Sequence, residues 1–345
     1  MATLQLDPAT LNAMRQLLQG KNRKWATPGD MAQHLDPDTI QTPALQLIDQ
    51  TLIDTTNTTD GRAIITLPPQ EGKSQRVSRR YPLWTLTHNP NTRIAIVSYS
   101  HAVARRWGRT IRDDITTHPD LGLTIRPDLS AQHEWQLAEA QGGVYTTGIG
   151  GSLTGRPVDL LIIDDPIKDR EQADSTIYRN RVWDWWTDVA STRLAPGAPV
   201  ILILTRWHQD DLAGRLLNAP DGHRWKLLNI PAQAETNNDP LGRKPGQWLQ
   251  SSRRRTTKQW EAIKQQAGSR TFNSLYQGHP SPPGGTIFNR EHWIIDPHPT
   301  WQADNNQQHW VPSGQVFTSW DLTFKSGEHT DWVVGQVWQN DGTTL

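Results

Sequence analysis

The chain has no cysteine, which excludes disulfide bonds, thiolate metal sites and cysteine nucleophiles. It also has no net charge, because 35 basic residues balance 35 acidic ones. A neutral chain has no global attraction to nucleic acid or to an anionic membrane, so any such contact must come from local patches. No apolar run approaches the roughly 20 residues of a membrane-spanning helix. Residues 1–7 lack the basic and apolar stretches of a signal peptide.

What the chain does contain is an alternation of short apolar runs and stretches with helical periodicity. Its 345 residues allow two domains, each with a core of ordinary size. Strands are predicted within residues 63–67, 91–100, 158–166, 198–208 and 225–231. Helices are predicted within residues 8–19, 44–55, 103–115, 178–194, 210–217 and 251–277. This order predicts an α/β fold with a mainly parallel, three-layer sheet. Core or interface packing is the default role of its 17 tryptophans.

The first predicted strand leads into residues 67–74, Leu-Pro-Pro-Gln-Glu-Gly-Lys-Ser, and then into a stretch that can begin a helix. This is the layout of a phosphate-binding P-loop. Backbone N–H groups cradle the phosphates, the lysine reaches the β/γ oxygens and the hydroxyl binds Mg²⁺. The strict pattern has glycine where this chain has Leu67, and two prolines instead shape the loop. The alternative is an ordinary surface loop.

Two adjacent acids, Asp164 and Asp165, end another predicted strand about 90 residues later. The carboxyl ends of parallel strands are where α/β proteins place ligands. Hydrolysis of a nucleoside triphosphate needs a phosphate cradle, a Mg²⁺ held by an acid and a carboxylate that orients the attacking water. Lys73 and Ser74 can supply the cradle and one metal ligand. Asp164 is then the candidate Walker B acid and Asp165 the candidate water-activating group. A helix N-cap or a turn is the alternative for the acid pair.

A glycine-rich segment at residues 141–156 predicts a strand and a tightly folded loop. Residues 142–156, followed by Leu-Ile-Ile-Asp-Asp-Pro-Ile-Lys-Asp-Arg-Glu at 161–171, resemble the large, ATPase–nuclease subunit of tailed-phage terminases, the motors that package DNA. Residues 68–74, 204–212 and 272–277 agree with it. The resemblance extends from about residue 40 to the last residue.

The resemblance implies an ASCE/RecA-like P-loop ATPase domain that hydrolyses ATP, with Mg²⁺, to move double-stranded DNA into a procapsid. The implied ATP-binding residues are Pro69, Gln70, Glu71, Gly72, Lys73 and Ser74. The implied catalytic residues are Lys73 and Asp165, and Ser74 and Asp164 are the implied magnesium ligands.

Two details of the ATPase motifs leave alternatives. Thr205 and Arg206 match the family's coupling motif, which senses the γ-phosphate; a helix cap is the alternative for Thr205. Where the family often has a basic P-loop residue, this chain has Gln70 or Glu71. The group that stabilises transferred charge is therefore left open between Lys73, Arg76 and an arginine of a neighbouring subunit. Glu71 also brings an acid close to the expected triphosphate, without an explanation from the sequence.

The family's second domain is an RNase H-like nuclease, in which several carboxylates hold two metal ions, Mg²⁺ or Mn²⁺. Residues 319–335 resemble its opening hairpin and agree with two strands predicted within 315–324 and 331–339. Asp321 matches the position of the first metal ligand in that family. Asp331 matches a recurrent acid, with capping of the second strand as the alternative.

The remaining nuclease acids are expected beyond residue 345, and two strands cannot bury a core or hold a two-metal site. We therefore expect the purified chain 1–345 to have no nuclease activity. Incubation with plasmid DNA and Mg²⁺ or Mn²⁺ checks this, and metal-dependent cleavage would contradict it.

The predicted organisation is an N-terminal helical segment (1–55), a P-loop ATPase core (56–235), a linker and helical segment (236–310) and an incomplete RNase H-like domain (311–345). The implied partners are double-stranded DNA, the terminase small subunit, the portal protein of the procapsid and further copies of the chain in a ring, with no membrane. The implied setting is the cytoplasm of the bacterial host.

Local basic clusters are the candidate DNA contacts. Arg253, Arg254 and Arg255 open the helical stretch predicted within 251–277, and a solvated helix start is the alternative. Arg105, Arg106, Arg109 and Arg112 lie off the apolar stripe of the helix within 103–115, where a solvated face is favoured over DNA contact.

Two other functions compete with a packaging motor. A helicase-like P-loop NTPase would need a second α/β domain after residue 240. A truncated, non-catalytic remnant is favoured by Leu67 and by the short C-terminal region.

Overall fold

The computed structural model describes residues 25–153 and 155–280 and four strands after residue 300. These strands belong to a separate compact unit, Thr286–Leu345, whereas the other described residues belong to the unit Met1–Gly285. The helix predicted at 8–19 and the candidate Asp331 lie outside the described residues.

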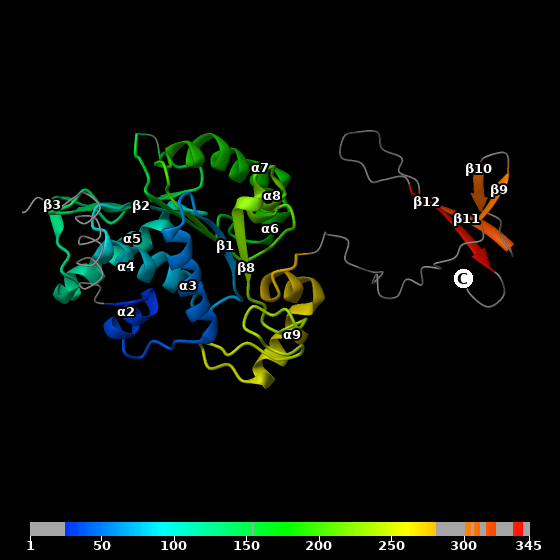
Figure 1. Cartoon of the computed structure of the whole chain (residues 1–345), viewed down its shortest axis with the longest axis horizontal. Coiled ribbons are helices and arrows are strands. Elements are labelled where there is room, and N and C mark those ends of the chain that lie inside the picture. Colours follow the sequence, from blue (N-terminus) through cyan, green and yellow to red (C-terminus); the bar gives the residue numbers. More distant parts are fainter. Residues whose placement is uncertain are drawn as a thin grey trace, which may run out of the picture. The chain divides into compact units, whose positions relative to one another are not determined.

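An eight-stranded sheet, in the order β3-β4-β5-β2-β6-β7-β1-β8, forms the centre of the first unit (Figure 1). The strands are β1 Arg62–Thr66, β2 Arg93–Ser98, β3 Ile125–Ser130, β4 Glu134–Leu137, β5 Gly143–Gly148, β6 Leu160–Asp164, β7 Val200–Ile203 and β8 Trp225–Asn229. The six strands from β5 to β8 in this order run parallel, and β4 and β3 add an antiparallel edge. The prediction of a mainly parallel α/β sheet is therefore confirmed.

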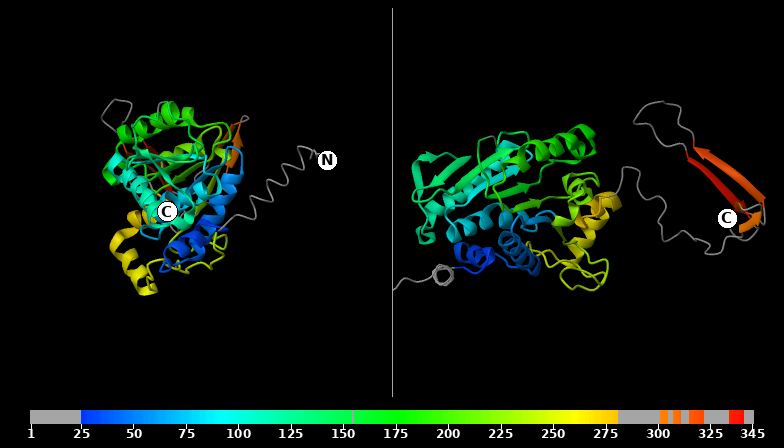
Figure 2. Two further views of the ribbon diagram at one scale, coloured as in Figure 1. Left: turned by 90° about the vertical axis from the view of Figure 1, so that its left-hand side faces the viewer. Right: turned by 45° about the horizontal axis from the view of Figure 1, so that its top comes forward.

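Helices cover both faces of the sheet (Figure 2), because the central strands are apolar on both sides. In β6, for example, Leu160 and Ile162 belong to one core and Leu161 and Ile163 to the other. One face is covered by α2 Pro28–Leu35, α3 Pro43–Asn57, α4 Tyr81–His88 and α5 His101–Thr117. The other is covered by α6 Arg170–Asp174, α7 Thr176–Asp184, a π-helical segment Trp185–Ala190 and α8 Leu212–Asn218.

The predicted amphipathic helix at 103–115 is α5, and its apolar stripe packs into the core except at Val103, which is half-buried. Trp107, Ile111 and Ile115 are buried, while Arg105 and Arg106 are exposed. Tryptophans elsewhere also serve the core. Trp186, for which packing was predicted, is buried and meets Trp225 edge to face at 5.6 Å between ring centroids.

The antiparallel edge formed by β3 and β4 was not predicted from the sequence. Pro127 interrupts the apolar pattern of β3, whose residues are half-buried or exposed. A proline lacks an N–H to donate, so it is tolerated in an edge strand that needs only one partner. An edge strand of this kind carries almost no periodic signal.

The helix expected after the P-loop begins as a π-helical segment, Gln75–Arg80, before α4. Pro82 cannot donate the backbone hydrogen bond that an α-helix would direct to Ser78. The wider turn therefore falls just before the proline, at the place where the helix leaves the loop.

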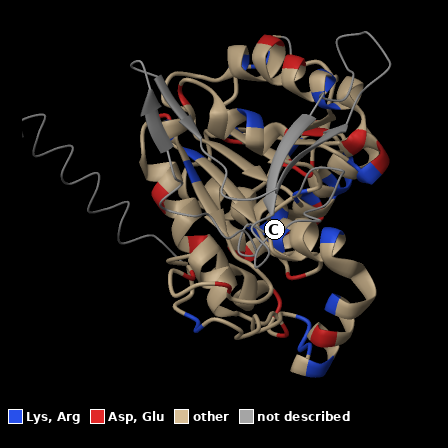
Figure 3. Ribbon diagram, turned by 90° about the vertical axis from the view of Figure 1, so that its right-hand side faces the viewer, with Lys and Arg blue, Asp and Glu red and all other residues tan. Residues whose placement is uncertain are grey.

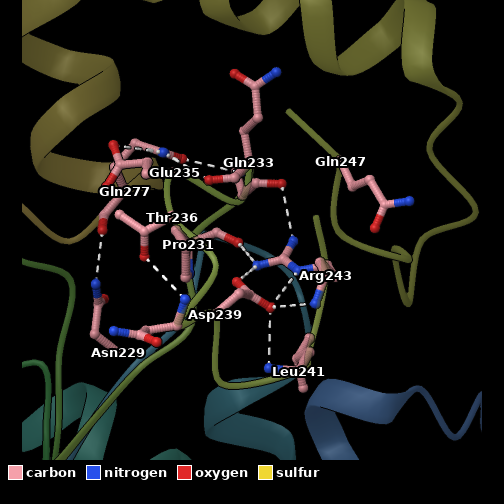
Figure 4. A network of polar contacts seen from close by, with 12 residues as sticks. Asn229, Pro231, Gln233, Glu235, Thr236, Asp239, Leu241, Arg243, Gln247 and Gln277 are labelled. Carbon is pink, nitrogen blue, oxygen red and sulfur yellow. Dashed lines mark hydrogen bonds and ion pairs between the residues drawn. The ribbon is translucent and has the colours of Figure 1, made fainter. Parts of the chain in front are cut away.

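Residues after β8 are attached to the sheet by polar contacts (Figure 4). The side chain of Asn229 donates to the carbonyl oxygen of Gln277 at 2.9 Å, and Gln277 donates to the carbonyl oxygen of Gln233 at 2.8 Å. Arg243 pairs with Asp239 at 2.7 Å. These bonds hold the segment before α9 (Thr257–Thr271) and the π-helical turn Phe272–Tyr276 after it against β8. The predicted domain boundaries remain predictions.

In the second unit, β9 Trp301–Asp304 pairs with β10 Gln307–Trp310, and β11 Gln315–Asp321 pairs with β12 Val334–Asn340, both antiparallel. The predicted pairing of the last two strands is confirmed. Asp321 lies at the end of β11, opposite Val334. The RNase H-like character of this hairpin stays a prediction. No helix in the part of the chain that the structure describes is long and apolar enough to cross a membrane.

Candidate nucleotide site

Three neighbouring strands bring the predicted ATPase residues to one edge of the sheet. β7 lies between β6 and β1 and is parallel to both. Their carboxyl ends lead into the pair Asp164–Asp165 (β6), the turn at Thr205 (β7) and the loop at 67–74 (β1). Sequence positions far apart therefore become neighbours because parallel strands end at the same edge.

The side chains at this edge are in direct contact. The hydroxyl group of Ser74 donates to Asp164 Oδ1 at 2.9 Å, and that of Ser78 donates to Asp164 Oδ2 at 2.8 Å. Lys73 Nζ lies 3.2 Å from Asp165 Oδ1, which also accepts the backbone N–H of Thr205 at 2.7 Å. Both Lys73 and Asp164 are buried. Ser78 is the one member of this cluster that the sequence did not predict; no motif of the sequence marks it.

The backbone at this edge adopts conformations that side chains normally avoid. Four non-glycine residues in the described part of the chain have positive φ, and two of them lie at this edge: Gln70 in the loop and Asp165 in contact with Lys73. Such residues cost about 1–3 kcal/mol each and cluster where function requires a special geometry. Gly72, with φ of 92°, takes the left-handed conformation that glycine tolerates.

Asp164 has the chemical character of a magnesium ligand. Burial, and secondarily the charge of Asp165, raises the pKa of Asp164 to about 6. A buried carboxylate next to a hydroxyl is a donor set that Mg²⁺ accepts, because this ion is usually held by one or two carboxylates, waters and substrate phosphates. Within the described ranges, no group of three or more His, Cys, Asp or Glu side chains forms a metal cage. The donor set of Asp164 and the Ser74 hydroxyl group fits a magnesium ion that keeps waters or phosphate oxygens as its other ligands.

We expect Asp164→Asn to raise the midpoint of thermal unfolding of the nucleotide-free protein at pH 8 by roughly 3 °C or more. The folded-state pKa of Asp164, about 6, lies above the ordinary value of 3.8, so the folded protein loses stability as the pH rises through this range. Asparagine removes the buried charge. Near pH 4.5, where folded Asp164 holds its proton, the gain should largely vanish. Thermal unfolding at both pH values checks this, with exposed Asp38→Asn as the control. An equal gain at both would contradict it.

Arg206 is paired with Asp211. Its Nε donates to Asp211 at 2.6 Å, and both side chains are buried. Asp211 also caps α8 by accepting the N–H of Gly214 at 2.8 Å. Thr205 therefore does not cap this helix. Its observed link to the site is the backbone N–H bond to Asp165, which ties the end of β7 to the acid.

Arg76, one of the candidates for supplying charge to the phosphates, has other partners in this structure. Its guanidinium group is buried and paired with Asp49 of α3, and Nη2 donates to Gln41 Oε1 at 2.6 Å. Gln41 in turn donates to Asp49 at 2.8 Å. Arg76 therefore anchors the helix after the loop to α3, a role that the sequence does not reveal because residues 49 and 76 share no motif.

This geometry predicts that Asp49→Ala lowers the free energy of unfolding by about 3–5 kcal/mol, because it leaves the buried Arg76 charge without a partner. Chemical denaturation measures the loss. Asp54→Ala is the matched control, since Asp54 is an exposed acid on the same helix. Equal stability of the two variants would show that the pair is not structurally important.

The basic cluster at 253–255 lies against the P-loop. Arg255 pairs with Glu71, and Arg253 Nε contacts the carbonyl oxygen of Gln70 at 3.4 Å. Charged positions of both signs are interspersed over the unit, with several basic ones on and before α9 (Figure 3). Arg255 is thus a paired, half-buried side chain and not a solvated helix start, whereas the DNA contact of residues 253–255 stays a prediction. The opposite charges of residues 71 and 255 are the only sequence signal of this pairing, and their separation hides it.

The fold places the chain among α/β proteins with a mixed, mainly parallel eight-stranded sheet and acids at its carboxyl edge. A sequence model of the terminase large subunit family, described as T4likevirus-type and N-terminal, matches residues 64–293, more than half of the chain. The chain therefore belongs to the terminase large subunit family, as its motifs predicted. No curated protein sequence matches it.

Several solved structures are similar. The HK97 bacteriophage large terminase shares 18% identity with a TM-score of 0.49, over 70% of this chain and 51% of that one. A mutant ATPase domain of the Thermus phage P74-26 large terminase shares 13% identity with a TM-score of 0.40, over 60% and 87%. The large terminase of a thermophilic bacteriophage, in complex with ADP, shares 11% identity with a TM-score of 0.39, over 68% and 50%. The chain spans about half the length of the HK97 protein. The family assignment rests on the sequence match.

Proposed function

We propose that this chain hydrolyses ATP as the motor subunit that packages double-stranded phage DNA into a procapsid. The observation that carries the proposal is the convergence of Lys73, Ser74, Asp164 and Asp165 within hydrogen-bonding distance at one sheet edge. Membership of the terminase large subunit family supports DNA as the substrate that is moved.

Each residue of the site has a role in this proposal. The loop from Pro69 to Ser74 cradles the triphosphate, and Lys73 exchanges its contact with Asp165 for the β/γ oxygens. Mg²⁺, when bound with ATP, neutralises phosphate charge. Ser74 and Asp164 hold it, and Asp165 orients the attacking water. A backbone bond from Thr205 keeps Asp165 in place, so that the end of β7 can respond to the γ-phosphate.

The partners belong to the same proposal. They are the small subunit, the portal protein and further copies of the chain in a ring, acting in the cytoplasm of the bacterial host. Because Arg76 is paired with Asp49, Lys73 and an arginine of a neighbouring copy are the two groups proposed to stabilise transferred charge. Asp321 and a divalent metal, Mg²⁺ or Mn²⁺, belong to the nuclease activity proposed for a complete RNase H-like domain.

The test is phosphate release from ATP by the purified chain, with and without Mg²⁺ and double-stranded DNA. We expect Mg²⁺-dependent turnover that DNA stimulates. Binding of ATP without turnover under all conditions would favour a non-catalytic remnant. Turnover stimulated by single-stranded DNA alone would favour a helicase-like enzyme.

A further inference from the structure

An acid inside a phosphate-binding loop opposes the charge of its ligand, and Glu71 stands only two positions before Lys73. The structure turns Glu71 away from the acid pair that contacts Lys73 and Ser74. Its side chain is 2% exposed. One carboxylate oxygen accepts the hydroxyl group of Ser251 at 2.9 Å, and the other accepts the backbone N–H of Ser252 at 2.7 Å.

Arg255 supplies the compensating charge. Its guanidinium group pairs with Glu71 and also donates to Gln70 Oε1 at 3.1 Å, so it contacts two successive residues of the loop. The same group lies over the ring of Trp260 in α9, 5.2 Å from the ring centroid. Trp260 is itself fully buried and donates to the carbonyl oxygen of Leu249 at 3.1 Å. The contact with Trp260 of α9 therefore positions Arg255 in the absence of a ligand.

Removal of Arg255 and removal of Glu71 have different consequences. If Arg255 is removed, Glu71 becomes a buried carboxylate whose remaining partners are neutral serine groups. A buried charge that loses its partner is strongly unfavourable, so the carboxylate is driven to move toward water. Movement of Glu71 displaces Gln70 and Gly72, whose backbone dihedral angles are already in the left-handed region. The shape of the loop therefore depends on residue 255.

We propose that Glu71 and Arg255 are positioning residues for the phosphate-binding loop. Their buried ion pair holds the loop in its ligand-ready shape and keeps the Glu71 charge off the polyphosphate. In this way the segment that leads into α9 sets nucleotide affinity. The inference rests on the proposed function, because it assigns a polyphosphate to the loop.

The experiment uses the whole chain and four proteins: wild type, Arg255→Ala, Glu71→Gln and the double variant. Two quantities are measured, the Kd for Mg²⁺–ATP and hydrogen exchange of the backbone amides in residues 67–74 without nucleotide. We expect Arg255→Ala to weaken ATP binding by about tenfold or more and to accelerate exchange in the loop. Glu71→Gln should weaken ATP binding less than Arg255→Ala does, because it leaves no buried carboxylate uncompensated and the freed Arg255 is partly exposed. The double variant should resemble Glu71→Gln, because no buried charge remains to be compensated.

Lys258→Ala is the control, because it removes an exposed positive charge from the start of α9. Where turnover is measurable, Arg255→Ala should raise KM more than it lowers kcat, a split that a general loss of stability does not produce. Additive losses in the double variant, or wild-type values for Arg255→Ala, would overturn the proposal. If Arg255→Ala does not fold, Arg255→Lys, which keeps the positive charge, is compared with Arg255→Gln, which removes it. If wild type does not bind ATP, the proposed function fails, and the exchange measurement still decides whether the pair shapes the loop.

Discussion

ATP turnover by Lys73→Ala is expected to fall at least about 100-fold below that of the wild type, because the loss removes an ammonium group aimed at developing phosphate charge. The side chain is buried, and its Nζ lies 3.2 Å from Asp165. The ammonium group of Lys73 is therefore already held at the carboxyl edge of the sheet. Its removal withdraws positive charge from the triphosphate and from both acids together.

The physical argument extends to the acid pair. The charge of Lys73 lowers the pKa of Asp164 against the larger effects of burial and of Asp165. Without Lys73, the pKa of Asp164 should rise further, and a protonated Asp164 is a poor metal ligand. Lys73→Ala should thus weaken Mg²⁺–ATP binding as well as turnover.

Phosphate release at saturating ATP and a direct binding measurement separate these two effects. Lys258→Ala, which removes an exposed lysine far from the acids in sequence, should retain wild-type turnover. Wild-type turnover by Lys73→Ala would reject the role of the loop.

For Asp165→Asn, we expect hydrolysis to fall by about 10²–10⁴-fold, the usual contribution of a general base. Binding of ATP should stay within about threefold, because the amide can still accept the Thr205 N–H bond. Asparagine is the right substitution because residue 165 has φ of 47°, which asparagine tolerates better than alanine.

A comparison with Asp164→Asn makes this test specific. Both variants remove one carboxylate from the same pair, but Asp164 is the residue in contact with Ser74. Asp164→Asn should lose the Mg²⁺ dependence of ATP binding, whereas Asp165→Asn should keep it. Identical defects in the two variants would contradict the division of roles, and normal hydrolysis by Asp165→Asn would exclude it as the water-activating group.

Much of the ATPase architecture could be predicted because strong local patterns specify it. The strands β1, β6 and β7 are nearly continuous apolar runs, which are typical of strands buried on both faces. Polar residues that follow such runs must lie at the carboxyl edge of a parallel sheet. For this reason the sequence alone was enough to assign Lys73, Asp164 and Thr205 to one edge.

Other features could not be predicted because they depend on single contacts between distant segments. β3 carries a proline and exposed side chains, so its edge position left no periodic signal. The buried pair of Asp49 and Arg76 looks in sequence like two ordinary surface charges.

The sequence by itself determined the fold class, the family and the residues that meet at the sheet edge. Hydrophobic periodicity and short motifs are local, so they can be recognised from the sequence without knowledge of the fold. Only the tertiary structure decided which charges are free to act and which are committed to partners. Glu71 is the example: an acid in the loop that the sequence left unexplained is buried and paired with Arg255. The reason is physical, since the effect of a charge depends on burial and on partners far away in sequence.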